Sequence, residues 1–262
     1  MDVANILTSM PSFVLFVLVV ATGMLSSWAG TWVAGKRYQK GVKELTTSTT
    51  TAVGAILGLS AFMLGFTFSM TAARFSSRKQ LVVQQAGAIG TSFLQTGLIP
   101  ERQKLIIREQ LRQYIDVLLN TKNSSDIDKK LERLDKLHYS IWHQTASLLN
   151  QPMDSELRSI FTSSINSVIE FGAERKTVAL IYKLASMLWI SLLTLFLLSM
   201  FSLGYHTDDY KKHGNLNGLL LASSFAMVIV LIADMDSQGL HSFKISQRPL
   251  EDIRQMMGAN IP

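Results

Sequence analysis

Four long stretches of this chain contain no charged side chain, and they limit the folds that it can adopt. They lie at about 11–34, 52–73, 184–205 and 216–233. An α-helix rises about 1.5 Å per residue, so about 20 apolar residues suffice to cross a hydrocarbon core of about 30 Å. Each stretch therefore predicts a transmembrane helix.

The four predicted helices divide the chain into parts. Residues 1–74 form a first transmembrane hairpin, 75–183 a polar block, 184–233 a second hairpin and 234–262 a C-terminal segment. In the polar block, apolar residues recur near helical spacing, as in the set Leu105, Leu111, Ile115 and Leu118. We therefore expect an all-α integral membrane protein with a helical extramembrane domain, on which the C-terminal segment packs.

Helix boundaries within the polar block follow from breakers and caps. Pro152, followed by Asp154 and Ser155, ends one helix and begins another. The apolar pattern of this last helix continues to Leu180, so the helix can run unbroken into the third span.

The sequence contains no recognisable motif of a catalytic or metal site. The chain has no cysteine, which excludes disulfides and thiolate sites. Its five histidines include no pair spaced by three or four residues, as a helical metal site requires. We find no phosphate-binding glycine loop, no GxSxG motif and no acid inside a span. We expect no enzyme, no cofactor, no metal and no nucleic-acid partner.

Basic residues gather beside the predicted spans, where they can contact anionic lipid headgroups. With both termini in the cytoplasm, the inner flanks carry eight Lys and Arg and the outer flanks six. The excess favours cytoplasmic termini in a multi-pass membrane protein. The first run lacks a basic flank before it and a clear cleavage site, so we expect it to remain as an anchor.

The segment 62–79 carries the most specific signal. It begins as an apolar helix, in which Phe62 and Phe66 share one face, and it ends with Arg74, Arg78 and Lys79. Arg74 follows Phe66 by eight residues and is expected close to the same face. Such a helix can line an ion pathway, or its aromatic side chains can simply pack against other helices or lipid.

The charges have similar alternatives. Arg74, Arg78 and Lys79 suit a pore mouth, a headgroup anchor or ion pairs with a neighbouring subunit or with Asp234 and Asp236. These two acids lie at the end of the fourth span and also suit capping. Gly54, Gly58 and Gly65 allow close helix approach, so an oligomer interface can use the face assigned to the pore.

Two segments resemble one family. Residues 64–93 read LGFTFSMTAARFSSRKQLVVQQAGAIGTSF. They are similar to the second-helix region of bestrophins, in which an Arg follows the Phe of an LGF-type triplet by eight residues and another Arg follows four residues later. The AIGT motif at 88–91 and the SQRPL ending at 246–250 resemble the bestrophin-like group of bacterial membrane proteins.

The resemblance implies an oligomer, a pentamer by analogy, that conducts inorganic ions. It maps the neck of the pore onto Gly58, Phe62 and Phe66, with glycine where the family has a larger apolar residue. Phe75 and Ser76 replace the paired tryptophans of true bestrophins, and the acidic calcium-binding cluster of animal members is absent.

The sequence thus favours an oligomeric bestrophin-like channel, more suited to anions, with a pore lined by the second transmembrane helix. The alternative is a non-conducting membrane sensor or scaffold whose helical domain binds a partner.

Overall fold

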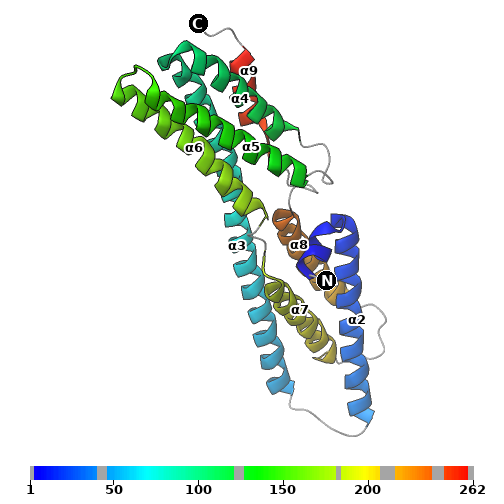
Figure 1. The fold of residues 1–262 in the computed structure, drawn as a ribbon. Coiled ribbons are helices and arrows are strands. Elements are labelled where there is room, and N and C mark those ends of the chain that lie inside the picture. The colour runs from blue at the N-terminus through cyan, green and yellow to red at the C-terminus, as the bar shows by residue number, and fades with distance from the viewer. Residues whose placement is uncertain are drawn as a thin grey trace. The chain divides into compact units, whose positions relative to one another are not determined.

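The computed structural model describes residues 3–39, 46–120, 127–180, 184–206, 216–237 and 245–258. Within these ranges all regular structure is helical, which confirms the predicted fold class (Figure 1). The chain forms two compact units. The first, here called the membrane unit, combines residues 1–76 and 183–244, and the second, the helical unit, combines 77–182 and 245–262.

Four helices are long and apolar enough to cross a membrane, as predicted. They are α2 (Ser12–Gln39), α3 (Thr46–Gln95), α7 (Ser186–His206) and α8 (Leu216–Asp236). A short helix, α1 (Val3–Ser9), precedes α2. Six of the cations in the orientation argument lie outside the described residues, namely Lys40, Lys43, Lys183, Lys211, Lys212 and Lys244.

Helices α2 and α7 cross at glycines in the membrane unit. A Cβ built on Gly204 would lie 1.9 Å from the Ser27 carbonyl oxygen, and one on Gly30 would lie 2.2 Å from the Phe201 carbonyl oxygen. The two backbones therefore touch without an intervening side chain, a packing mode that small residues allow in membranes.

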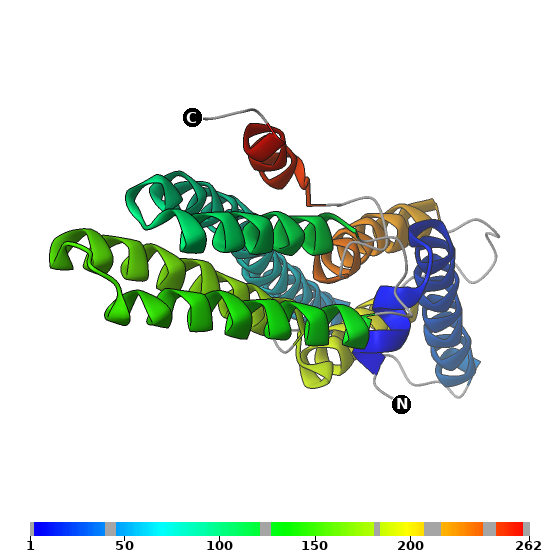
Figure 2. The same cartoon turned by 45° about the horizontal axis from the view of Figure 1, so that its top comes forward.

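The helical unit contains α4 (Glu101–Leu119), α5 (Ile127–Ala146), α6 (Ser155–Leu180) and α9 (Arg248–Gly258). Helices α4, α5 and α6 lie side by side (Figure 2). Short 3-10 turns occur at η1 (Thr96–Leu98) and η3 (Ser147–Asn150). Buried apolar side chains from α3 to α9 fill one core, among them Phe93, Ile107, Leu111, Ile141, Phe161 and Leu250.

One residue of the apolar pattern in α4 is not buried. Leu105 is 62% exposed, whereas Ile107 is fully buried. Residues 107, 111, 114, 115 and 118 share the packed side of α4, and Leu105 lies about 200° from Ile107 around a helix of 3.6 residues per turn.

The expected start of α6 is confirmed. The Asp154 carboxylate accepts hydrogen bonds from the backbone N–H groups of Glu156 and Leu157, at 2.8 and 3.2 Å. This is the contact of an N-cap residue. The possibility of an unbroken helix from α6 into α7 is wrong, because Leu184 and Ala185 are not helical. The Leu184 N–H donates to the Asp236 carboxylate at 3.1 Å instead.

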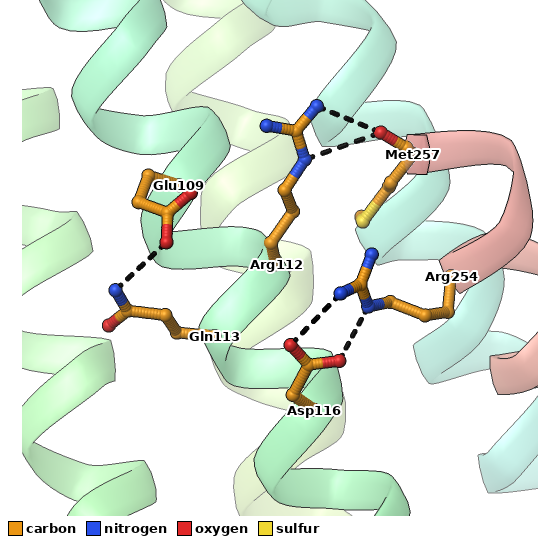
Figure 3. Close-up of polar contacts among 6 residues, drawn as sticks. All are labelled: Glu109, Arg112, Gln113, Asp116, Arg254 and Met257. Carbon is orange, nitrogen blue, oxygen red and sulfur yellow. Dashed lines mark hydrogen bonds and ion pairs between the residues drawn. The ribbon is translucent and has the colours of Figure 1, made fainter. Parts of the chain in front are cut away.

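Two arginines hold α9 against α4 (Figure 3). Arg112 on α4 donates to the Met257 carbonyl oxygen through Nε at 3.3 Å and Nη2 at 2.8 Å. Arg254 on α9 donates to both carboxylate oxygens of Asp116, the longer contact being 3.2 Å. Contacts in both directions fix the register of the two helices.

Removal of the Arg254 contact is expected to loosen α9 slightly. The side chains of Arg254 and Asp116 are 37% and 52% exposed, so solvent screens their attraction. We expect Arg254→Ala to lower the opening free energy of α9 by only about 0.5–1 kcal/mol. Hydrogen exchange of the 248–258 peptides in the intact protein measures this change. Arg248→Ala, at an exposed position of the same helix, is the matched control, and an equal effect of both variants would contradict the assignment.

Candidate functional site

One side of α3 is fixed by packing within the membrane unit. Val53, Ser60, Leu64, Thr67 and Thr71 are all buried, at spacings of three, four and seven residues. The Ser60 Oγ lies 2.6 Å from the Ser199 Oγ and 3.1 Å from the Leu195 carbonyl oxygen of α7. These polar contacts set the rotation of α3 about its axis.

The opposite side of α3 carries the predicted neck residues. The side chains of Phe62 and Phe66 are 67% and 53% exposed, and a Cβ on Gly58 would meet no atom within 4 Å. Gly54 and Gly65 are equally open. All three neck positions thus lie on the side of α3 that the single chain leaves uncovered.

The composition of this uncovered side differs from that of the exposed side of α2. The exposed positions of α2 between 13 and 32 carry mainly large apolar residues, namely Phe13, Val14, Val17, Leu18, Ala21, Leu25, Trp28 and Trp32. Those of α3 between 51 and 76 carry mainly small or hydroxyl residues besides four large ones, Leu59, Phe62, Phe66 and Phe68. Small residues in membranes suit close contact between helices.

Arg74 does not lie on the same side as the two phenylalanines. Eight residues of helix turn about 80° beyond two full turns, so Arg74 is rotated away from Phe66 toward Thr71. It is half-buried, its Nη2 lies 3.9 Å from the Met70 Sδ, and its Nη1 is buried without a hydrogen-bond partner among the residues that the structure describes. The expectation of one shared face is therefore wrong.

The remaining predicted cations lie in the part of α3 that belongs to the helical unit. Arg78 is half-buried and Lys79 is exposed. Together with Arg74 they are the charged residues of α3, whose 50 residues include no Asp or Glu. Every charge that this helix presents is therefore positive.

The two predicted acids are buried and bonded within the membrane unit. Asp234 is 5% exposed, and its Oδ1 accepts a hydrogen bond from the Ser12 hydroxyl at 2.7 Å. Asp236 is 4% exposed and accepts from the Leu184 backbone N–H ahead of α7. These contacts join the end of α8 to Ser12 at the start of α2 and to Leu184, which precedes α7.

Sequence reasoning missed the contacts of Ser60 and Ser12. Serine inside an apolar run is a weak signal, since its hydroxyl often bonds to the carbonyl four residues earlier in the same helix. The Ser60–Ser199 contact joins residues 139 positions apart, and no local pattern announces such a pair.

Comparisons with known proteins agree with this architecture. A family model described as the Bestrophin-like domain matches residues 17–250. No curated protein matches the sequence. The crystal structure of a bacterial bestrophin homolog from Klebsiella pneumoniae, solved by Zn-SAD phasing, is similar with a TM-score of 0.68 at 12% identity, over 95% of this chain and 99% of that one.

A second crystal structure, of a bacterial bestrophin homolog from Klebsiella pneumoniae that carries a mutation, has a TM-score of 0.70 at 11% identity, over 92% of this chain and 97% of that one. At such identities the likeness concerns the fold alone. The family model, in contrast, extends from the first span through the last and into α9. The chain therefore belongs to the Bestrophin-like family.

Proposed function

We propose that copies of this chain assemble in the bacterial inner membrane into a symmetric ion channel, a pentamer by analogy with the family. In this assembly the uncovered side of α3 faces the central axis, and both termini lie in the cytoplasm. The observation that carries the proposal is the open side of α3, where Phe62 and Phe66 project among small residues while the opposite side is packed.

The two phenylalanines would form the constriction. Rings of phenyl groups exclude water, and an ion that crosses them loses much of its hydration. Gly58 leaves the third position open, so the constriction rests on two rings. The positive edges of the phenyl groups favour an anion in this place.

The charge of α3 supports an anion pathway further. A helix with Arg74, Arg78 and Lys79 and without any Asp or Glu raises the local concentration of anions and lowers that of cations. The test is the reversal potential of the purified protein in planar bilayers under a KCl gradient. We expect the reversal potential to be shifted from zero toward the equilibrium potential of chloride. A reversal potential shifted toward the equilibrium potential of potassium would contradict anion selectivity, but it would still show that the protein is a channel.

Truncation of the constriction is expected to change the current through single channels. Phe62→Ala and Phe66→Ala each remove a phenyl group from every copy and widen the narrowest point, so we expect conductance to rise about twofold or more. Single-channel recording in planar bilayers measures this.

The matched control for these variants is Phe13→Ala. Phe13 is 77% exposed on α2, where the large apolar neighbours suit lipid, and its removal should leave conductance unchanged. Absence of current from intact wild-type oligomers would favour the sensor or scaffold. An equal change of conductance in Phe13→Ala would contradict the assignment of α3 to the ion pathway.

A further inference from the structure

A chain of hydrogen bonds runs through the helical unit and ends at the start of α9. Arg175 on α6 is its central member and donates from Nη1 to the Gln85 Oε1 at 2.8 Å. Gln85 on α3 donates from Nε2 to the Tyr114 hydroxyl at 2.8 Å, and that hydroxyl lies 2.8 Å from the His138 Nε2 on α5. Four helices therefore meet at one polar cluster.

The directions of these hydrogen bonds follow from the Arg175 guanidinium. A guanidinium can only donate, so the oxygen of the Gln85 amide faces Arg175 and its nitrogen faces Tyr114. The Tyr114 oxygen thus accepts from Gln85 and has its own proton left to donate. The acceptor within reach is the His138 Nε2, and this arrangement requires a neutral ring with its proton on Nδ1.

The other nitrogen of Arg175 holds the C-terminal segment. Its Nη2 donates to the Gln247 Oε1 at 3.0 Å. The Gln247 carbonyl oxygen accepts from the backbone N–H groups of Leu250 and Glu251 at 2.9 and 3.1 Å, so it belongs to the first turn of α9. One arginine therefore connects the Tyr114–His138 pair to the start of α9.

The pair is tightly enclosed. Gln85 and Tyr114 are each 1% exposed. A Cβ on Gly172 of α6 would lie 2.7 Å from the Tyr114 hydroxyl and 2.8 Å from the His138 Cε1. If His138 gained a proton on Nε2, the Tyr114 hydroxyl would face two donors and its own proton would lose its acceptor.

We propose that protonation of His138 breaks this chain of hydrogen bonds and releases the start of α9, so that the C-terminal segment opens reversibly as the pH falls. The proposal concerns the helical unit alone and does not rest on ion conduction. His138 is the group that titrates, and Tyr114, Gln85 and Arg175 pass its change of state to Gln247.

Burial sets the direction of the response, and the charges around His138 modify it. Burial lowers the pKa of His138 most strongly; Asp135, one turn earlier on α5, raises it, and Lys176 on α6 lowers it. Lys176 also pairs with Asp135 at 2.9 Å. From α4 the facing group is Tyr114, whose pKa is raised by burial, from α3 it is the Gln85 amide, and from α6 also Arg175, which bonds to Gln85.

Because the pKa of His138 is lower in the folded unit than in the unfolded chain, the unfolded or opened state binds more protons. The closed state is therefore fully favoured above pH about 6.5 and loses stability as the pH falls below it. Local opening at α9 has the same dependence on pH if it exposes the His138 ring to solvent.

Hydrogen exchange of the 245–258 peptides in the intact purified protein tests the proposal. After correction for intrinsic exchange rates, we expect the opening constant of the wild-type protein to rise about threefold to tenfold from pH 7.5 to pH 5.5. His138→Gln should reduce this rise to less than about twofold, because an uncharged amide replaces the titrating ring. Tyr114→Phe should open α9 already at pH 7.5.

The matched control is His143→Gln, since His143 is an exposed histidine of the same helix. It should respond to pH as the wild-type protein does. If His138→Gln does not fold, Gln247→Ala tests the proposal instead. Loss of the hydrogen bond from Arg175 to Gln247 should raise the opening constant of α9 at pH 7.5 and abolish its dependence on pH. A wild-type protein without a pH response, or variants that keep the full response, would overturn the proposal.

Discussion

Gly204→Ala is expected to lower the melting temperature of the protein by about 5–10 °C. The new Cβ would lie 1.9 Å from the Ser27 carbonyl oxygen, 2.7 Å from its carbon and 2.9 Å from the Ser27 Cα. All three atoms belong to the backbone, so no side-chain rotation relieves the contact. Helices α2 and α7 must separate, and neighbouring contacts such as that of Gly30 with Phe201 must separate with them. Overpacking of this kind costs about 1–3 kcal/mol.

The melting temperature is measured by the loss of the monodisperse chromatographic peak after heating of the detergent-solubilised protein. Gly54→Ala is the control, because it places the same methyl group on a transmembrane helix where no atom lies within 4 Å of it. Equal melting temperatures of Gly204→Ala and the wild-type protein would contradict the close crossing of α2 and α7.

Phe93→Ala is expected to have the largest effect on the helical unit, about 3–5 kcal/mol. The Phe93 ring is 1% exposed at the centre of the core. The guanidinium carbons of Arg108 and Arg112 lie 5.0 and 5.5 Å from its centroid. Removal of the ring leaves a cavity and withdraws the aromatic face from both cations. Since Arg112 also binds the Met257 carbonyl oxygen, the end of α9 should loosen as well.

Thermal unfolding followed by circular dichroism reports the loss of stability, and hydrogen exchange reports the state of α9. The adjacent Leu94 is 50% exposed, so Leu94→Ala removes an apolar side chain from the same turn without opening the core. Similar melting of the two variants would place Phe93 outside the core.

The sequence predicts the spans well for a simple reason. A run of about 20 uncharged residues has few stable environments besides a membrane, so hydropathy alone identifies α2, α3, α7 and α8. The start of α6 is equally local, because Asp154 caps a helix that begins one residue later. Leu105 and Ile107 show the limit, since both are apolar and only the fold decides which of them is buried.

The candidate site shows the same limit more sharply. The spacing of Phe62 and Phe66 places them on one side of a helix, but the direction of that side depends on Ser60 and its partner Ser199 on a distant helix. Arg74 was expected beside them because eight residues approximate two turns, and the residual rotation of about 80° is enough to move it toward the packed side. The cluster around His138 joins α3, α4, α5 and α6, so no sequence window contains it.

The charge of α3 has a consequence for the cohesion of the proposed assembly. Each copy brings Arg74, Arg78 and Lys79 without an acid on the same helix. In the proposed assembly, copies arranged around α3 would therefore repel one another at low ionic strength. An anion that occupies the axis offsets this repulsion, and a ligand that binds the assembled state favours it by mass action. The permeating ion would then also serve as a counterion that holds the subunits together, and dilution of salt would dissociate them.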